Sequence, residues 1–486
     1  MSTSSVLPES RSAKGSRAGL LTDRVVLTLL ALVLFLAFKL HQYAAFGVHG
    51  ELADFESMLW SVVHGGPLQK SPDAAPFFSQ HVSPVLYALV PVYALAGSPY
   101  TLLVVQAVAA ALAIVPLHIL AASLLPGRVV AACVSVAFLL YRQFHYGVLY
   151  DFHMEILYPL LYFSLFAAFE KRRWVPFYLF LLLTVCVKED ANLANLGLGL
   201  YLILRREPRH GLATLGFSAV SLLLAVGVII PHFREGLPDS YQFTHYWSGY
   251  GATRAEIVRA MLNPLRHLEV IFTGYKVGKM LTLFSGLLFL PLLSWRAALC
   301  LVLPGWFILY SSDNRLMNAL LIYYGLLVIP FLFYSALITI RSLGARWPRK
   351  SGRIVPAVSA LLLLTVLGNS RVFKLMNPEE WRIDPRYRAA EEMIDRLPRT
   401  APVAAQVDLQ SHVPAREWRE LIPRGIPRAE YLLFDTAGSS WPLSRDENLA
   451  LVDSLRAASG WTVLDDREGF VLLQRAETGH ESGLQD

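Results

Sequence analysis

Residues 47–60, GVHGELADFESMLW, form the first polar stretch after the first apolar block, and FFSQHVSP (77–84) follows across a Gly/Pro-rich gap. Acidic side chains crowd into six residues of this stretch, namely Glu51, Asp54 and Glu56. A segment facing lipid could not keep three carboxylates, so the stretch predicts a loop at the membrane surface, held there by its aromatic residues. We interpret residues 47–81 as the first wall of an active site.

Composition places the rest of the chain in the membrane. Of 486 residues, 55% are hydrophobic and 16% are charged, and the mean hydropathy is +0.44. The apolar residues come in long blocks, which predicts a polytopic membrane protein. The net charge of +6 does not indicate nucleic-acid binding, because Lys and Arg gather in short loops between apolar blocks. Cys133, Cys186 and Cys300 lie inside apolar stretches without metal-like spacing, which indicates buried thiols and no disulfide framework.

The basic loops set the orientation. Residues 1–24 are Ser-rich and basic, and the apolar run that follows from residue 25 is too long for a cleaved signal, so we expect a cytoplasmic N-terminus. The later basic segments should also be cytoplasmic: Arg128, 171–173, 205–209 and 341–353. The acidic loop is then extracytoplasmic. One apolar segment, 82–96, contains Pro84 and Pro91, and we expect it to be embedded without crossing fully.

Residues 25–369 therefore predict a membrane all-α bundle of roughly 11 to 12 helices. After residue 369 the charge content rises. The strand-like runs VAAQV, EYLLFD and WTVL follow or alternate with the helical runs AAEEMIDRL and ENLALVDSLRAASG. We expect a small extracytoplasmic α/β domain over 370–486, with Gly460 as a helix C-cap and DDREG as a hairpin turn.

Charged clusters collect on the predicted outer side. Besides the acidic loop and His81, they are Asp151, His153 and Glu155, and then Lys188, Glu189 and Asp190. The alternation in the first cluster suits a divalent metal or a group that assists a phosphate, although no complete metal-ligand pattern is present. The second cluster fits either a site or an internal ion-pair group at a helix break.

Several runs together resemble a known family. ELADFESMLW, HVSPVLYALVPVYAL with LLVVQAV, YDFHMEILYP and VKEDANL with LGLGLYLILRR are similar, in this order, to a bacterial family of polytopic membrane proteins known only as a domain of unknown function. The resemblance spans residues 25 to about 340, with a weaker match in RYRAAEEMIDRLPRTAPVAAQ. That family resembles the GT-C membrane glycosyltransferases. The acidic-Leu-Gly opening of the family stands here as Glu51-Leu52-Ala53, and its second acid as Glu56.

The GT-C resemblance implies a function. A sugar would move from a polyprenyl-phosphate carrier in the membrane lipid to an unknown acceptor outside the cytoplasm, and the chain would lie in the bacterial inner membrane. A carboxylate takes the proton of the acceptor hydroxyl, so Glu51 or Asp54 is the expected base, with Glu56 and Asp151 as alternatives. Cations hold the departing phosphate. The candidate binding residues are His81, His153, Glu155, Lys188, Glu189, Asp190 and Arg254, with Lys276 and Lys279 as further cations.

Two other classes of function stay open. The same intramembrane charges could serve a transporter or flippase for a lipid-linked or polar solute, although the two halves of the chain show no repeat of hydropathy. The second alternative is a non-catalytic scaffold whose outer domain binds a partner. Convergence of Glu51, Asp151 and Glu189 on one outer site favours the transferase, whereas positions along a two-sided path favour transport.

Overall fold

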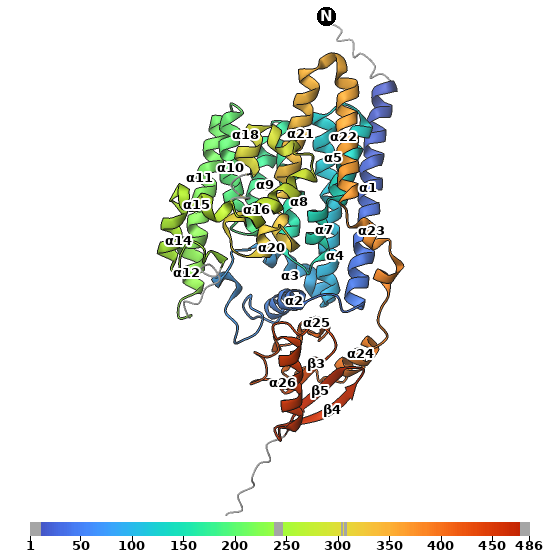
Figure 1. Ribbon diagram of the computed structural model, residues 1–486, viewed down its shortest axis with the longest axis vertical. Coiled ribbons are helices and arrows are strands. Elements are labelled where there is room, and N and C mark those ends of the chain that lie inside the picture. The colour runs from blue at the N-terminus through green and yellow to red at the C-terminus, as the bar shows by residue number, and fades with distance from the viewer. Residues whose placement is uncertain (1–10, 238–245, 303–304, 306–308, 477–486) are drawn as a thin grey trace, which may run out of the picture.

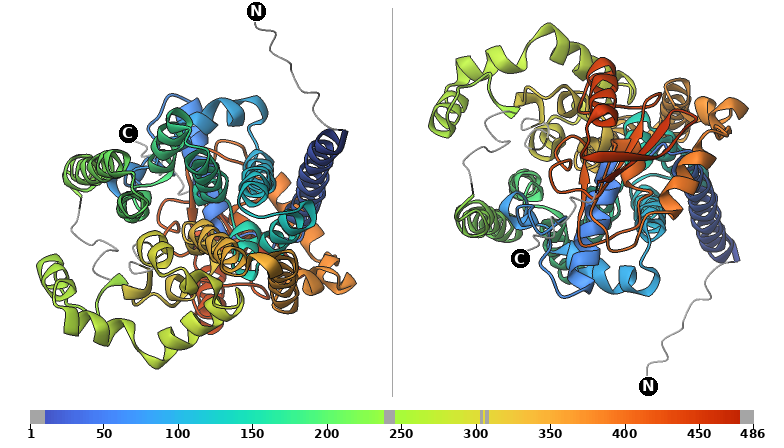
Figure 2. Two further views of the ribbon diagram at one scale, coloured as in Figure 1. Left: turned by 90° about the horizontal axis from the view of Figure 1, so that it is seen from above. Right: turned by 90° about the horizontal axis from the view of Figure 1, so that it is seen from below.

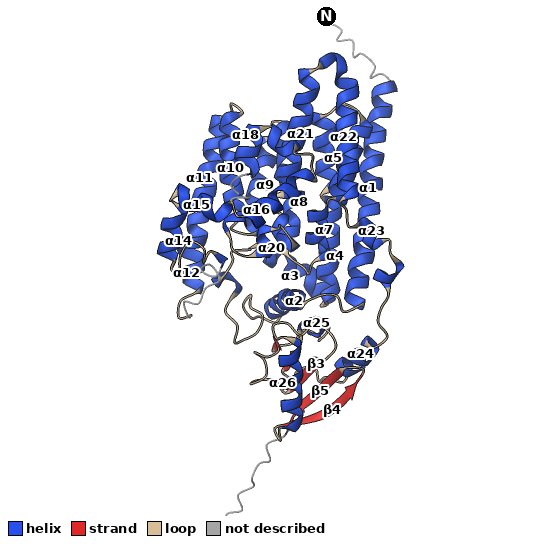
Figure 3. Cartoon of the chain, viewed as in Figure 1, coloured by secondary structure: helices blue, strands red, loops and turns tan. Residues whose placement is uncertain are grey.

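The computed structural model describes residues 11–237, 246–302, 305 and 309–476. A helical body is followed by a small domain that contains every described strand (Figures 1 and 3). The first helices are α1 (Arg11–Ala44), α2 (Gly50–Val63), η1 (Phe77–Ser79), α3 (Val85–Ala96), α4 (Pro99–Leu112), α5 (Ile114–Leu124), α6 (Arg128–Leu140), α7 (Arg142–Leu149), η2 (Met154–Ile156), α8 (Leu157–Glu170), α9 (Trp174–Val187), α10 (Ala191–Leu204), α11 (Pro208–Leu224), η3 (Ala225–Ile229) and α12 (Ile230–Phe233).

The second half of the body is more broken. Its helices are α14 (Arg254–Met261), α15 (Pro264–Ile271), α16 (Gly274–Ser285), α17 (Leu290–Leu293), α18 (Trp295–Ala297), η4 (Ala298–Val302), α20 (Arg315–Asn318), η5 (Ile322–Gly325), α21 (Ile329–Arg346), η6 (Pro348–Lys350), α22 (Ser351–Gly368), α23 (Val372–Leu375) and η7 (Pro378–Trp381). Figures 1 and 2 show α14 and α15 at the periphery of the body, on the side away from α1.

The described helices include four that are long and apolar enough to cross a membrane, Ala18–Ala44, Pro99–Leu124, Pro208–Phe233 and Pro348–Gly368. Two bent helix pairs raise this number to six, and α3, α9 and α10 are shorter apolar helices. The expected 11 to 12 spans therefore include several helices below full spanning length. Helix α3 has 12 residues and contains Pro91, so it rises about 18 Å against a hydrocarbon core of about 30 Å. This length is short of a straight crossing, and incomplete crossing by this segment stays a prediction.

The loops expected to be cytoplasmic meet at one end of the body. Arg128, at the start of α6, pairs with Asp23 near the start of α1. Glu170, at the end of α8, lies 3.4 Å from Arg205 and 3.6 Å from Arg341. Basic segments far apart in the sequence thus share one end. The start of α1 lies at this end and the strand-containing domain lies at the opposite end, as the expected orientation requires (Figure 1).

The C-terminal domain is built on a five-stranded sheet in the order β2-β1-β3-β5-β4. Strand β1 pairs in parallel with β2 and β3, while β5 is antiparallel to β3 and β4. The elements are α24 (Tyr387–Asp395), β1 (Val403–Ala405), α25 (Val407–Gln410), β2 (Arg419–Leu421), β3 (Tyr431–Asp435), α26 (Arg445–Ala457), β4 (Trp461–Arg467) and β5 (Phe470–Arg475). The expected strands and helices are present, and β2 is an additional strand.

Two local expectations for this domain need correction. The C-cap of α26 is Ala458 and not Gly460, because the helix ends two residues earlier than expected. Strand β4 continues through Asp465 to Arg467, so the β4–β5 turn is only Glu468-Gly469, both with positive φ. A two-residue turn with two positive φ angles matches the twist of the flanking strands, which explains why the hairpin closes so tightly.

Helix α2 lies between the helical body and the C-terminal domain (Figure 1), and the view from below in Figure 2 shows the sheet domain over this part of the body. Apolar side chains cover both faces of the sheet, and one of these clusters includes Phe46 from the segment between α1 and α2. The acidic stretch that opens the first loop is therefore enclosed from two sides.

Candidate active site

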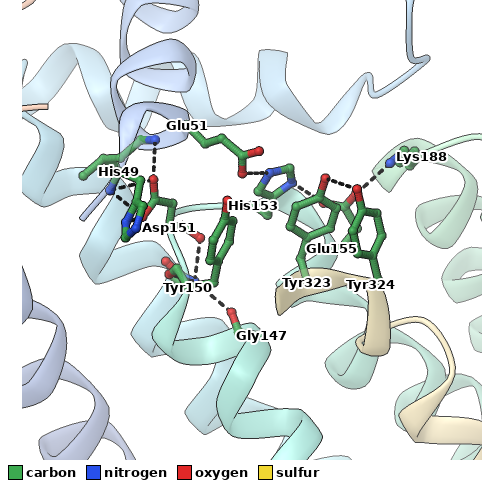
Figure 4. Close-up of polar contacts among 12 residues, drawn as sticks. His49, Glu51, Gly147, Tyr150, Asp151, His153, Glu155, Lys188, Tyr323 and Tyr324 are labelled. Atoms are coloured by element: carbon green, nitrogen blue, oxygen red, sulfur yellow. Dashed lines mark hydrogen bonds and ion pairs between the residues drawn. The ribbon is translucent and has the colours of Figure 1, made fainter. Parts of the chain in front are cut away.

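The start of α2 is fixed by Asp151. Both of its carboxylate oxygens accept from the backbone N–H of His49, at 2.8 and 2.9 Å, and one also accepts from the N–H of Leu52 at 3.4 Å (Figure 4). A carboxylate at a helix N-terminus satisfies N–H groups that have no partner within the helix and lies at the positive end of its dipole. Asp151 is fully buried, so its role in this arrangement is to orient α2, and it does not reach an acceptor hydroxyl.

Two buried side chains hold the turn that carries Asp151. The Lys39 ammonium of α1 donates to the carbonyl of Tyr150 at 2.5 Å, and the Gln106 amide of α4 donates to the carbonyls of Tyr150 and Asp151 at 3.1 and 3.2 Å. Both side chains are fully buried. Lys39 and Gln106 could not be recognised from the sequence, because each is a single polar residue inside a long apolar block.

Four side chains from three separate segments form a continuous chain of contacts, which we call the relay: Glu51, His153, Glu155 and Lys188. The Nε2 atom of His153 lies 2.7 Å from Glu51 Oε2, and its Nδ1 lies 2.9 Å from Glu155 Oε2 (Figure 4). Lys188 Nζ donates to the other oxygen of Glu155 at 2.9 Å. Predicted site residues 102 and 33 positions apart are therefore in direct contact.

Charges alternate along the relay, and this sets its protonation. Burial alone would lower the pKa of His153, but the carboxylates of Glu51 and Glu155 outweigh burial and raise it to about 9. Burial opposes ionisation of Glu51, yet His153 holds the pKa of that carboxyl below its ordinary value. At neutral pH the relay therefore carries two carboxylates, one imidazolium and one ammonium, which balance.

Only one end of the relay is open to an external molecule. The side chain of Glu51 is 38% exposed, while those of His153, Glu155 and Lys188 are 10%, 3% and 11% exposed. A group that reacts with an acceptor must be reachable. Glu51 is therefore the one carboxylate of the relay that an external molecule can reach, and the other three residues support it from within.

Aromatic rings enclose the relay. The ring of Tyr323 in η5 stacks on His153 with a centroid distance of 3.5 Å and an interplanar angle of 16°. Phe55 of α2 contacts the same imidazole edge-on at 5.0 Å. The hydroxyl of Tyr323 donates to that of Tyr324 at 3.1 Å (Figure 4). The sequence analysis missed both tyrosines, because they stand in an apolar run that was expected to belong to a membrane span.

The neighbouring cluster, Glu189 and Asp190, lies beside the relay. Glu189 accepts from the backbone N–H of Val82 at 2.8 Å and lies 2.8 Å from Nδ1 of His81. Asp190 accepts from the hydroxyl of Tyr158, and burial raises its pKa to about 6 against the nearby Lys188 ammonium. Glu189 and Asp190 thus lie near the Lys188 end of the relay, whereas the Asp151 carboxylate faces the backbone of α2. Convergence of Glu51, Asp151 and Glu189 on one outer cavity stays a prediction.

The other two acids of α2 pair with residues outside the relay. Asp54 pairs with Lys70 at 3.2 Å, and Lys70 also lies 3.9 Å from Glu420 of the C-terminal domain. Glu56 is 1% exposed and lies 3.0 Å from Arg419 of that domain. A carboxylate buried under a guanidinium cannot reach an acceptor hydroxyl. The structure therefore argues against Glu56 as an alternative base.

The candidate metal set does not form. Both ring nitrogens of His153 contact carboxylates, and the carboxylate of Asp151 turns to the backbone of α2. Across the described residues, no group of three or more His, Cys, Asp or Glu side chains is arranged to hold a metal ion. Alternate residues of an extended segment share one side, yet the Asp151 carboxylate binds the backbone of α2 while His153 and Glu155 contact each other.

The remaining cations lie in the second half of the body. Arg254 is the first residue of α14, and its side chain lies outside the described part. Lys279 lies over the ring of Tyr275 at 5.3 Å. Lys276 is buried, donates to the carbonyl of Val270 at 3.0 Å and lines a cavity of about 360 Å³. Charged residues of this cavity are Arg266, Glu269, Lys276, Asp313 and Arg315.

Comparisons with known proteins agree with this architecture. The family described as "Predicted membrane protein (DUF2079)" matches residues 51–472. A crystal structure of ArnT from Cupriavidus metallidurans bound to undecaprenyl phosphate is similar with a TM-score of 0.55 and 13% identity, covering 93% of this chain and 98% of that chain. ArnT in the apo state gives a TM-score of 0.49 and 14% identity, covering 92% and 97%. No curated protein matches. The expected resemblance to the GT-C membrane glycosyltransferases is confirmed at the level of the fold.

Proposed function

Since the chain belongs to the predicted membrane protein family DUF2079 and has the GT-C fold, we propose that it is a membrane glycosyltransferase that moves a sugar from a polyprenyl-phosphate donor to an acceptor outside the cytoplasm. The similar ArnT structure has undecaprenyl phosphate bound. The observation that carries the proposal is the relay, because it presents one ionised, reachable carboxylate on a rigid support.

In the proposed reaction, the acceptor hydroxyl attacks the anomeric carbon of the sugar. The new bond joins the acceptor oxygen to that carbon, the bond from carbon to the phosphate oxygen breaks, and the electron pair leaves with the lipid phosphate. Glu51 takes the hydroxyl proton as the new bond forms. Its lowered pKa keeps it ionised at neutral pH, and the hydroxyl becomes acidic enough to lose its proton only as it bonds to carbon.

His153, Glu155 and Lys188 act behind Glu51. His153 fixes the carboxylate at 2.7 Å, and Glu155 and Lys188 keep the imidazolium in place through contacts of 2.9 Å. A carboxylate held in this way loses no freedom when the reaction begins, which is how preorganised polar groups lower a barrier. Tyr323, stacked on His153, keeps water from its buried face.

The departing phosphate needs cations. Lys188 is paired with Glu155 inside the relay. Three further cations line the cavity beside α20, namely Arg266, Lys276 and Arg315, and of these Arg266 pairs with Glu269 at 3.0 Å. Arg315 opens α20, and Tyr323 of the relay wall follows it in η5. Eight positions separate Arg315, which lines the cavity, from Tyr323, which stacks on His153. This proximity in sequence supports a donor whose phosphate binds in the cavity and whose sugar points towards Glu51.

The proposed reaction also assigns an orientation. The protein would lie in the bacterial inner membrane with its N-terminus in the cytoplasm and residues 370–486 outside. The basic loops that share the end of the body at which α1 starts support this assignment, because positively charged loops stay on the cytoplasmic side.

A transfer assay tests the proposal. Purified protein in lipid nanodiscs would be incubated with labelled polyprenyl-phosphate sugars and with cell-envelope extract as the source of acceptor, and release of polyprenyl phosphate would be measured. Glu51→Gln should lower the rate on the order of a hundredfold, because the hydroxyl loses its proton acceptor. Asp54→Asn is the matched control on the same helix and should keep most of the rate, because Asp54 faces Lys70. Full activity of Glu51→Gln would reject the mechanism.

A further inference from the structure

A single buried arginine connects the C-terminal domain to α2. Arg419, the first residue of β2, is fully buried and donates through Nη2 to the Ala53 carbonyl at 2.6 Å, to Ser57 Oγ at 2.8 Å and to Glu56 at 3.0 Å. Its Nη1 donates to the carbonyls of Gln410 and Val413 in its own domain. One guanidinium therefore binds both parts of the molecule.

These contacts need the geometry of arginine. The planar guanidinium has donors in fixed directions, whereas a lysine ammonium at the same place is a compact point charge that cannot reach both sets of carbonyls. Removing a buried cation would also leave Glu56, which is 1% exposed, without its partner. The link is thus both directional and electrostatic.

The segment before α2 is held by the same domain. Phe46 lies in the apolar core of the C-terminal domain, stacked against Tyr387 with a centroid distance of 4.5 Å and against His412 at 3.6 Å. The hydroxyl of Ser411 donates to the carbonyl of His49 at 2.6 Å. Glu51 therefore lies between two attachment points that both belong to the C-terminal domain.

We propose that Arg419 is a positioning residue that fixes α2, and with it the Glu51 carboxylate, from the C-terminal domain. Asp151 holds the start of α2 from the helical body, and Arg419 holds its second turn from the opposite side. In this proposal the C-terminal domain contributes to the geometry of the transfer site. The catalytic consequence rests on the proposed function, while the positioning of α2 does not.

The test uses the full-length protein in nanodiscs and compares two buried arginines of the same domain. Arg419→Lys keeps the charge and removes the directional contacts to α2. Arg416→Lys is the matched control, because Arg416 is also buried and, among the described residues, its hydrogen bonds go to the carbonyls of Pro398, Ala401 and Pro414 within its own domain. Hydrogen exchange followed by mass spectrometry reports separately on residues 50–63 and on the sheet strands.

In Arg419→Lys, exchange in residues 50–63 should become about tenfold faster or more, with β3 and β5 changed less than about twofold. In Arg416→Lys, residues 50–63 should exchange as in the wild type. Ser57→Ala removes one acceptor of Arg419 without touching a charge and should give a smaller increase at the same residues. Unchanged exchange of α2 in Arg419→Lys, or an equal increase in Arg416→Lys, would overturn the proposal.

Transfer kinetics give the catalytic readout. Arg419→Lys should lower kcat about tenfold or more with little change in KM for the donor, because Glu51 is displaced while the donor cavity stays intact. Arg416→Lys should leave both values near those of the wild type. A wild-type protein without transfer activity would reject the proposed function, and the exchange data would still decide whether Arg419 positions α2.

Discussion

Replacing Glu155 with glutamine should separate the support of the site from its chemistry. Glu155 is 3% exposed and binds two cations, His153 and Lys188, each at 2.9 Å. The variant keeps the shape of the side chain and removes one negative charge, so the relay changes from a net charge of zero to +1. Two hydrogen bonds to charged groups contribute about 1.5–3 kcal/mol each, and the remaining amide oxygen retains one of them in part. We therefore expect a loss of about 3 kcal/mol in the free energy of unfolding.

The same variant should change the titration of His153. With one of its two carboxylates gone, the pKa of His153 should fall from about 9 towards its ordinary value of 6.5. Some of the imidazolium then loses its proton near neutral pH, which relieves part of the charge imbalance and keeps the loss of stability from growing further.

The assay is unfolding in mild detergent, followed by tryptophan fluorescence and evaluated as a difference from the wild type. Asp453→Asn serves as the control, because Asp453 is 73% exposed and pairs with Arg456 only at the surface. It should leave stability unchanged. If Glu155→Gln stayed within about 0.5 kcal/mol of the wild type, the relay would not be a buried ionic network and our reasoning about its protonation would be refuted.

Three further outcomes are expected. Folding raises the pKa of His153 from 6.5 to about 9, so the stability that its protonation contributes is complete below about pH 6.5 and is lost as the pH rises through 9. The Tm of the wild type should therefore fall between about pH 7 and 10, and the Tm of His153→Gln should not. A flat profile in the wild type would contradict this expectation. A cysteine at residue 400 should react with an impermeant maleimide from outside the cell, and labelling only after lysis would reverse the orientation. Asp151→Ala should destabilise the protein by about 1–3 kcal/mol in detergent unfolding, because the N–H groups of His49 and Leu52 lose their acceptor; wild-type stability would show that this cap contributes nothing.

The sequence predicted the parts of the molecule that depend on solvation. A carboxylate such as Glu51 cannot face lipid, and basic loops such as that of Arg128 stay together on one side, so the bundle and the polar end could be read from hydropathy. Strand-like and helix-like runs likewise predicted the C-terminal strands and helices. The contact between Glu51 and His153 could be anticipated because two acidic turns near a membrane favour a shared polar site.

The features that could not be predicted from the sequence depend on where individual side chains point in the folded protein. Tyr323 stacks on His153 from the segment Arg315–Gly325, which meets the helix Ile329–Arg346 at a bend of 82°. An apolar sequence does not reveal such a bend. Lys39 seemed to be one polar residue in a membrane helix. Arg419 stands in a surface-like sequence, EWREL, although its side chain is fully buried. Sequence spacing also placed Asp54 and Glu56 beside Glu51, whereas in the structure each of the three acids has a different partner, namely His153 for Glu51, Lys70 for Asp54 and Arg419 for Glu56.

The link through Arg419 gives the assembly of this protein an order in time. Helix α2 is synthesised among the first residues, but the partner of Glu56 follows 363 positions later. During synthesis and membrane insertion, the Glu56 carboxylate therefore has no Arg419 to pair with until the C-terminal domain has been made. When only the helical body has emerged from the ribosome, α2 still lacks its contacts with the C-terminal domain. Synthesis and folding of that last domain then complete the site.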